Sequence, residues 1–212
     1  MKEQVARSFR TLRGPGSAEL EIKRSRFLGI AQPARDEATV HALLASVRAT
    51  HPDANHHCFA YRIGQEGGIA RFSDDGEPGG TAGRPMMEVL LREELVDVAV
   101  VVTRYFGGVL LGSGGLVRAY GQAASEALRA AGFSAMRPNT EMEVRVEYSQ
   151  FGALEQCLLQ AGLAATAAVY TEHVTLLVPV PSGQEPSFAT LIADLTAGTG
   201  LVTPGQTIYL PE

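Results

Sequence analysis

Residues 96–120 read VDVAVVVTRYFGGVLLGSGGLVRAY. The run Val96–Thr103 is apolar and rich in β-branched residues, which is typical of a strand buried on both faces of its sheet. A glycine-rich segment then leads into a helix expected over about Gly115–Ala130, which Gly132 would end. The stretch therefore predicts a buried strand, a glycine-rich loop and a helix in that order.

The residues before this stretch predict strands followed by helices. Strands with a polar break at Arg24-Ser25-Arg26 are expected first, and a helix opened by Asp36 or Glu37 follows them. A second pair of strands joined by a turn at Gly64–Gly68 then precedes a helix with Met86, Met87, Leu90 and Leu91 inward. The expected strands are Ala18–Ser25, Phe27–Pro33, Cys58–Ile63 and Ile69–Phe72, and the helices end at His51-Pro52 and near Leu95.

The last third of the chain has a clear order of its own. Pro138-Asn139 is expected to mark a boundary between domains at residues 1–135 and 136–212. The segments beyond it alternate as strand, helix, two strands, helix and strand, which is the ferredoxin-like βαββαβ unit. The expected elements are Glu141–Tyr148, Gln150–Ala161, Ala164–Tyr170, His173–Val180, Pro186–Ala197 and Leu201–Leu210.

Composition indicates an ordinary globular protein. Of the 212 residues, 45% are apolar and 19% are charged. No apolar run approaches the ~20 residues that a membrane span needs, and no apolar segment follows the basic N-terminus as in a secretory signal. The two cysteines, Cys58 and Cys157, are expected to be reduced thiols of a cytoplasmic protein.

The charge of the chain is divided unevenly. The net charge of −5 argues weakly against a general nucleic-acid binder. Residues 1–135, however, hold 16 of the 18 Lys and Arg residues and carry +1, whereas residues 136–212 carry −6. An anionic partner is therefore expected to meet the N-terminal part.

The first loop of interest is Arg71–Pro85, RFSDDGEPGGTAGRP, which leaves a strand and enters a helix. Its glycines let backbone N–H groups approach a ligand, and the free N–H groups of a first helical turn favour an anion. Thr81 can cap the helix and Arg84 can clamp the anion. The alternative is a turn in which Asp74 and Asp75 cap their own backbone.

The second loop repeats this arrangement. Arg104 precedes it, Gly112–Gly115 opens the helix, and Arg118 lies one turn inside. No phosphate-binding loop of the G-x-x-x-x-G-K-[ST] type and no complete G-x-G-x-x-G occurs. The two loops are expected to face one cleft in which arginines hold phosphates. Aromatic side chains there would stack on bases or pack in the core, and core packing is preferred for Phe106.

Metal and acid–base chemistry find little support. The histidines and carboxylates around His57 match no standard zinc spacing, so we expect neither a metal nor another cofactor. Asp74, Asp75 and Glu77 can act as acids or bases, but no partnered nucleophile accompanies them. The sequence therefore favours binding over catalysis and leaves an enzyme possible.

At these loops the sequence resembles the IMPACT family and, within it, the bacterial YigZ-like proteins. The resemblance rests on Asp74–Pro78, Gly80–Pro85, Val101–Gly108 and Gly112–Tyr120, with Ser25–Phe27 and His56–Tyr61 upstream. It covers about residues 15–132 strongly and the acidic tail more weakly. It implies an α+β fold with two domains. The first would be similar to a domain of a small-subunit ribosomal protein and to domain IV of elongation factor G, and the second to the ferredoxin-like domain V of that factor.

The resemblance also implies functions. Eukaryotic relatives are tied to control of translation under starvation, and nucleic-acid binding is the usual proposal for bacterial members. The leading hypothesis is a binder of RNA, the ribosome or a translation factor, with no membrane association. The alternatives are an enzyme acting on a phosphorylated or nucleotide metabolite and a protein-interaction module. The candidate ligand-binding residues are Arg26, His57, Arg71, Asp74, Asp75, Glu77, Gly80, Thr81, Gly83, Arg84, Arg104, Tyr105, Gly107, Gly108, Gly112, Gly114, Gly115, Arg118 and Tyr120.

Overall fold

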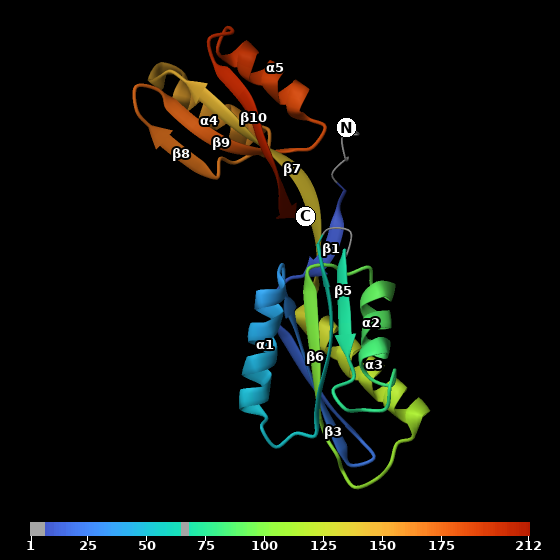
Figure 1. Cartoon of the computed structure of the whole chain (residues 1–212). Coiled ribbons are helices and arrows are strands. Elements are labelled where there is room, and N and C mark those ends of the chain that lie inside the picture. The colour runs from blue at the N-terminus through green and yellow to red at the C-terminus, as the bar shows by residue number, and fades with distance from the viewer. Residues whose placement is uncertain (1–6, 65–67) are drawn as a thin grey trace. The chain divides into compact units, whose positions relative to one another are not determined.

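A computed structural model of the chain describes residues 7–64 and 68–212. Contacts divide it into two compact units, one formed by Phe9–Ala135 and the other containing Met136–Glu212. Each unit holds its own sheet and helices (Figure 1), so the protein has the expected α+β fold with two domains.

The first unit is built on a five-stranded antiparallel sheet in the order β2-β3-β6-β4-β5. The central strand β6 pairs with β3 on one side and β4 on the other, and a short strand, β1, precedes the sheet. The bounds are Phe9–Leu12 for β1, Gly16–Ile22 for β2, Ser25–Pro33 for β3, His56–Ile63 for β4, Ile69–Ser73 for β5 and Val98–Tyr105 for β6.

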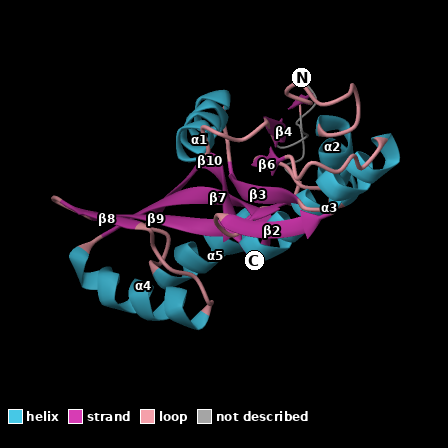
Figure 2. Ribbon diagram, turned by 90° about the horizontal axis from the view of Figure 1, so that it is seen from below, coloured by secondary structure: helices cyan, strands magenta, loops and turns pink. Residues whose placement is uncertain are grey.

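The helices cover both faces of this sheet (Figures 1 and 2). Helix α1, Glu37–Thr50, lies on one face, and α2, Gly83–Arg92, and α3, Ser113–Ala131, lie on the other. The apolar residues of β6 alternate between the two resulting cores. Val98, Val100 and Val102 face α2 and α3, whereas Ala99 and Val101 face α1, as predicted for a strand buried on both faces.

Three details of this unit differ from the sequence-based prediction. The hairpin turn is Lys23-Arg24, and Ser25 and Arg26 already belong to β3, because the inward alternation of β2 continues to Ile22. Helix α2 starts at Gly83 and ends at Arg92, so Leu91 lies on its outer side and is 51% exposed. Of the predicted turn Gly64–Gly68, residues 65–67 lie outside the described residues.

The second unit has strand order β10-β7-β9-β8 with antiparallel pairing, as in ferredoxin-like βαββαβ domains. Pro138 and Asn139 lie inside β7 and not in a linker. Pro138 lies opposite Tyr209 of β10 and precedes the part of β7 that pairs with β9, which begins at Asn139, so its missing N–H breaks no bond to β9. The elements are β7 Phe133–Val146, α4 Tyr148–Gln160, β8 Ala167–Tyr170, β9 Val174–Pro181, α5 Glu185–Leu195 and β10 Leu201–Pro211.

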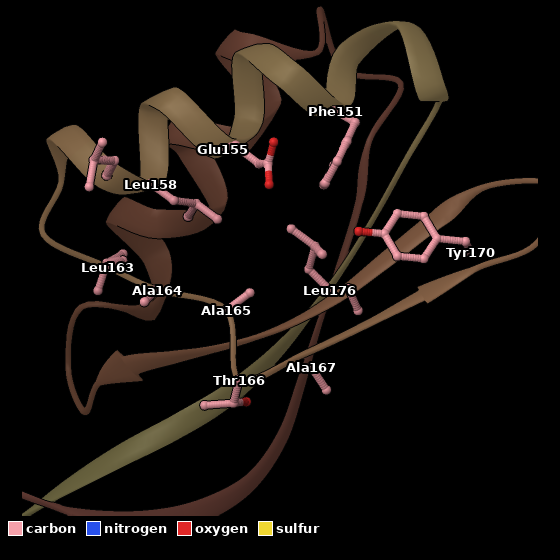
Figure 3. A pocket seen from close by; sticks show the side chains of 12 residues that line it. Phe151, Glu155, Leu158, Leu163, Ala164, Ala165, Thr166, Ala167, Tyr170 and Leu176 are labelled. Carbon is pink, nitrogen blue, oxygen red and sulfur yellow. The ribbon is translucent and has the colours of Figure 1, made fainter.

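A depression of about 520 Å³ lies between α4 and β8 in this unit (Figure 3). Its wall is apolar and includes Phe151, Leu158 and Leu176, and Glu155 is the one charged residue that lines it. The alanines between Leu163 and Ala168 are too small to fill the space under α4. The residues that line the depression offer apolar contact and do not form a cluster of catalytic side chains.

The Lys23-Arg24 turn is strained. Both residues have positive φ, 48° and 66°, as a two-residue type I′ turn requires, and this region suits Asn-Gly far better than Lys-Arg. We therefore expect Lys23→Asn/Arg24→Gly to raise the free energy of unfolding by about 1 kcal/mol. Urea denaturation monitored by circular dichroism measures the change, and a loss of stability would contradict this assignment of the turn.

Candidate functional site

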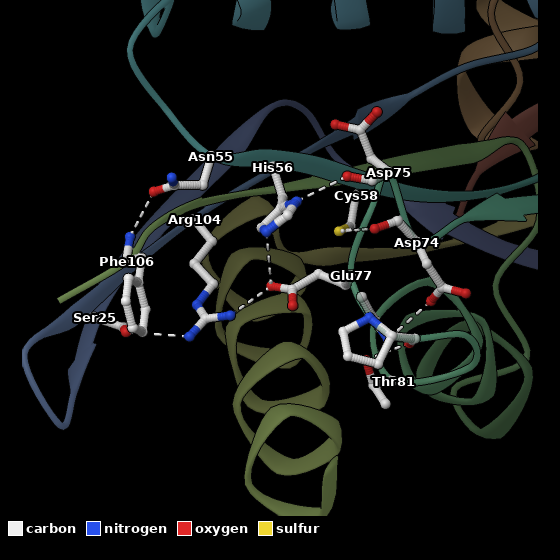
Figure 4. A network of polar contacts seen from close by, with 12 residues as sticks. Ser25, Asn55, His56, Cys58, Asp74, Asp75, Glu77, Thr81, Arg104 and Phe106 are labelled. Carbon is white, nitrogen blue, oxygen red and sulfur yellow. Dashed lines mark hydrogen bonds and ion pairs between the residues drawn. The ribbon is translucent and has the colours of Figure 1, made fainter. Parts of the chain in front are cut away.

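A buried ion pair joins the two glycine-rich loops of the first unit (Figure 4). Nη1 of Arg104, at the end of β6, lies 2.7 Å from Oε1 of Glu77 in the loop before α2, and the two side chains are 6% and 3% exposed. The same oxygen accepts a hydrogen bond from Tyr120 of α3 at 2.6 Å. Arg104 also donates to Oγ of Ser25 at 3.3 Å. Four separate segments therefore meet at this ion pair, through Glu77, Arg104, Tyr120 and Ser25.

This arrangement corrects the predicted roles of three residues. Glu77, Arg104 and Tyr120 were expected to contact a ligand, but they lie in the interior, where Arg104 and Tyr120 both donate to Glu77. Buried charges keep their ionised form only with a partner and further hydrogen bonds, so Arg104 is not free to hold a phosphate.

The N-terminus of α2 is also occupied by the protein itself. The Asp74 carboxylate accepts hydrogen bonds from the N–H groups of Gly80 at 2.8 Å, Ala82 at 3.0 Å and Gly83 at 2.8 Å. Burial alone would raise the pKa of Asp74, but these three bonds outweigh it and lower the pKa. Asp74 takes the place expected for an external anion, which is the alternative that the sequence left open.

Asp75 and the histidines brace the same loop against β4. Asp75 accepts the backbone N–H of His57 at 2.7 Å and pairs with Arg48 at 3.2 Å. His56 Nδ1 donates to the Asp75 carbonyl at 2.8 Å, and its Nε2 lies 3.9 Å from Glu77. The imidazole of His57 contacts the Thr103 hydroxyl, and burial lowers its pKa, so the ring is neutral at pH 7.

Two more groups near this loop are engaged inside the unit. Cys58 donates its S–H to the Asp74 carbonyl at 3.0 Å, and burial raises the pKa of the thiol to about 12. Its thiolate is therefore unpopulated at neutral pH. Thr81 is buried and donates to the Pro78 carbonyl at 2.6 Å, so it stabilises the loop and does not cap the helix as expected.

The arginines do not converge on one cleft as expected. Arg26 pairs with Glu19 at 2.7 Å, Arg71 with Glu37 at 3.3 Å and Arg84 with Glu88 at 3.2 Å, all at the surface. Arg118 is exposed in a groove of about 480 Å³ between α2 and α3. In the part of the chain that the structure describes, Arg118 has no hydrogen-bond or ion-pair partner.

The glycines mainly permit close packing. A Cβ on Gly83 would lie 2.7 Å from the Ser73 carbonyl oxygen, and one on Gly107 would lie 2.0 Å from that of Arg24. Gly107 therefore lets the β6–α3 loop press against the β2–β3 turn. The remaining predicted glycines lie in the loops or the first turn of α3, and they are Gly80, Gly108, Gly112, Gly114 and Gly115.

Tyr120 and Phe106 differ in burial from what the sequence predicted. Tyr120 is fully buried, edge-on to Phe27, whereas Phe106 is 46% exposed. Tyr105 is half-buried, with its hydroxyl 3.0 Å from His51 Nδ1 and its ring under the Arg26 guanidinium. The spacing of Tyr120 with Leu116, Ala119 and Ala123 marks one inward helix face and was the available signal for its burial.

Several exposed cationic and apolar residues lie where the β2–β3 turn meets the β6–α3 loop at Gly107. We call this the hairpin-end surface and define it as Lys23, Arg24, Phe106, Val109 and Leu110. Leu110 is 82% exposed, and neither Lys23 nor Arg24 has a partner among residues 7–64 and 68–212. Sequence reasoning missed the two cations because it placed the turn one residue later.

The N-terminus of α3 begins just beyond this loop. Its N-cap, Gly112, has no side chain to accept a hydrogen bond, and no acidic residue lies in its first turn. Within the described residues, no side chain accepts from the N–H groups of Ser113, Gly114 or Gly115. The contrast with the α2 N-terminus, which Asp74 fills, leaves one helix N-terminus open to solvent.

The described residues offer neither a metal-binding group nor a membrane-spanning helix. No group of three or more histidines, cysteines, aspartates or glutamates that could hold a metal ion occurs among them. None of the helices within residues 7–64 and 68–212 has the length and apolar content to cross a membrane.

Comparison with known proteins gives the family. Residues 23–128 match the Impact N-terminal domain, and residues 144–199 match a domain of unknown function, DUF1949. The chain belongs to the IMPACT family. IMPACT family member YvyE of Bacillus subtilis is 35% identical over 205 residues, which cover 97% of this chain and 94% of YvyE.

Two further comparisons agree with this assignment. YigZ of Escherichia coli is 39% identical over 181 residues, covering 84% of this chain and 89% of YigZ. A crystal structure described as that of a hypothetical protein superposes with a TM-score of 0.63 at 35% identity, over 95% of this chain and 99% of the other. These matches show the family, and their names specify no ligand.

The buried pair predicts a large and specific loss of stability. Glu77→Gln leaves the Arg104 guanidinium buried without a counter-charge, so we expect the free energy of unfolding to fall by about 3 kcal/mol. Glu77→Gln/Arg104→Met removes both charges and should recover most of that loss. Glu19→Gln, at a pair whose side chains are each 51% exposed, should change stability by less than about 1 kcal/mol. Equal losses in the single and double variants would contradict the pairing.

Asp74 predicts a pH-dependent stability. Because folding lowers its pKa, its contribution is present above the pKa of an unfolded aspartate, about 3.9, and is lost as pH falls through the lower folded value. Asp74→Asn should reduce the free energy of unfolding by about 1.5 to 3 kcal/mol at pH 7. The difference from the unsubstituted protein should shrink below about pH 4. A difference that stays constant down to pH 2 would contradict this role of the charge.

Proposed function

We propose that this protein binds RNA, free or within the ribosome, through the hairpin-end surface of its first unit. Lys23 and Arg24 would contact phosphates, and the free N–H groups at the N-terminus of α3 would donate hydrogen bonds to a neighbouring phosphate. Such a ligand is consistent with a cytoplasmic protein that acts in translation. This surface replaces the phosphate-binding cleft that the sequence predicted around Arg84, Arg104 and Arg118, because Arg104 is buried in an ion pair.

The observation that carries the proposal is the strained cationic turn. Lys23 and Arg24 hold positive φ values where Asn-Gly would be more stable. Strain of this kind persists where a residue serves a purpose other than stability. Both residues are exposed cations without an acidic partner in the described part of the chain, which suits contact with a phosphate backbone.

The neighbouring helix end supports the same ligand. Three exposed or half-exposed N–H groups at Ser113, Gly114 and Gly115 lie at the positive end of a 19-residue helix dipole. Glycine at two of these positions lets a phosphate oxygen approach the backbone.

The distribution of charge and the hydrogen bonds of the carboxylates favour RNA binding by the first unit over an enzymatic function. The second unit carries the −6 of residues 136–212, so RNA contacts are expected on the first unit. Asp74, Asp75 and Glu77 accept hydrogen bonds from the protein itself, which favours binding over acid–base catalysis of a phosphorylated metabolite.

The test uses a fluorescently labelled 12-nucleotide single-stranded RNA and anisotropy at several salt concentrations. Lys23→Asn/Arg24→Gly should weaken binding and reduce the slope of log K against log salt by about 0.7 for each lost phosphate contact. The variant keeps a favoured turn, so it should fold at least as well. Arg35→Ala/Arg145→Ala removes two exposed charges elsewhere and should leave both quantities nearly unchanged. Equal effects of the two variants, or none from either, would overturn the proposal.

A further inference from the structure

The backbone of Phe106 is held in place by hydrogen bonds, although its ring is exposed. Its backbone N–H donates to Oδ1 of Asn55 at 2.8 Å, and the Asn55 N–H donates to the carbonyl of Arg104 at 3.0 Å. Asn55 therefore ties the strand end to the loop from both sides. A fixed aromatic loses little conformational entropy when a flat ligand binds to it.

The buried guanidinium of Arg104 lies against the ring of Phe106 (Figure 4). The Arg104 guanidinium lies over two aromatic rings, 5.4 Å from the centroid of Phe27 and 5.5 Å from that of Phe106. Arg104 is itself fixed by Glu77 and Ser25. One side of the Phe106 ring thus faces a rigid guanidinium, and its 46% exposure leaves the other side to solvent.

The surroundings of the ring suit a nucleotide. Lys23 and Arg24 lie across the Gly107 contact, within the same hairpin-end surface, and supply charges for the phosphate. Gly108, two residues after the ring, is exposed and has open space where a Cβ would lie, so a sugar–phosphate backbone can pass close to the chain there. Stacking on an aromatic face is open to every base, but only where the base is unpaired.

From these contacts we infer that Phe106 is a stacking platform for an unpaired nucleobase, so the hairpin-end surface takes single-stranded rather than duplex nucleic acid. This inference rests on the proposed function and adds the class of ligand to it. Phe106 sets the preference for unpaired bases, and Lys23 and Arg24 supply the charge contacts that single and double strands share.

The chain contains no tryptophan, which gives a direct spectroscopic test. Phe106→Trp places a single indole at the platform, and stacking of a base should quench its fluorescence when a 12-nucleotide single-stranded RNA is added. Phe72→Trp is the matched control, because Phe72 is similarly exposed, at 48%, on β5. Quenching at Phe106→Trp alone supports the inference, and equal quenching or none at either position overturns it.

Affinity measurements separate stacking from apolar contact. Phe106→Ala should weaken single-stranded RNA binding about fivefold to a hundredfold and leave the salt slope and duplex binding unchanged. Phe106→Leu should weaken it similarly, whereas Phe106→Trp should retain it. Single-stranded DNA of the same sequence should show the same dependence, since its bases present the same faces. Full binding by Phe106→Leu, equal losses for duplex, or single-stranded DNA that ignores Phe106 would overturn the inference.

The two proposals fail differently. If Lys23→Asn/Arg24→Gly weakens binding and Phe106→Ala does not, the stacking inference is wrong and the proposed function stands. If neither substitution changes RNA binding, the proposed function itself is wrong.

Discussion

The buried ion pair between Arg104 and Glu77 is the constraint on which the rest of the first unit depends. It joins the end of the central strand to the loop before α2, and it draws in α3 through Tyr120 and β3 through Ser25. Removing two charges from water is costly, so the pair is stable only because these partners surround it. Glu77 of the first family motif and Arg104 and Tyr120 of the second therefore stabilise the fold of the first unit.

The same pair determines what reaches the surface. With Arg104 fixed inside, the chain leaves β6 at a defined place, and Asn55 sets Phe106 beside the β2–β3 turn. Asp74 closes the N-terminus of α2, whereas that of α3 stays open. The two glycine-rich loops look alike in sequence but differ in role: the first stabilises the domain and the second borders the proposed RNA surface.

Much of the fold could be predicted because its signals are local. The apolar run of β6 and the order of elements in the second unit follow from periodicity and turn residues. The site could not be predicted as well, since N–H groups at a helix end donate equally well to an internal carboxylate and to an external phosphate. Only the folded chain places Asp74 at Gly80 and Gly83, and only it brings Glu77 to Arg104 across 27 residues.

The difference between the two helix ends can be measured directly. Backbone amide ¹H–¹⁵N shifts during titration with a short single-stranded RNA report which N–H groups meet the ligand. The proposed surface predicts shifts at Lys23, Arg24, Phe106 and Ser113–Gly115, and none at Gly80–Gly83, whose N–H groups already donate to Asp74 or, for Thr81, to the Pro78 carbonyl. Shifts centred on Gly80–Gly83, with the β2–β3 turn unaffected, would contradict it.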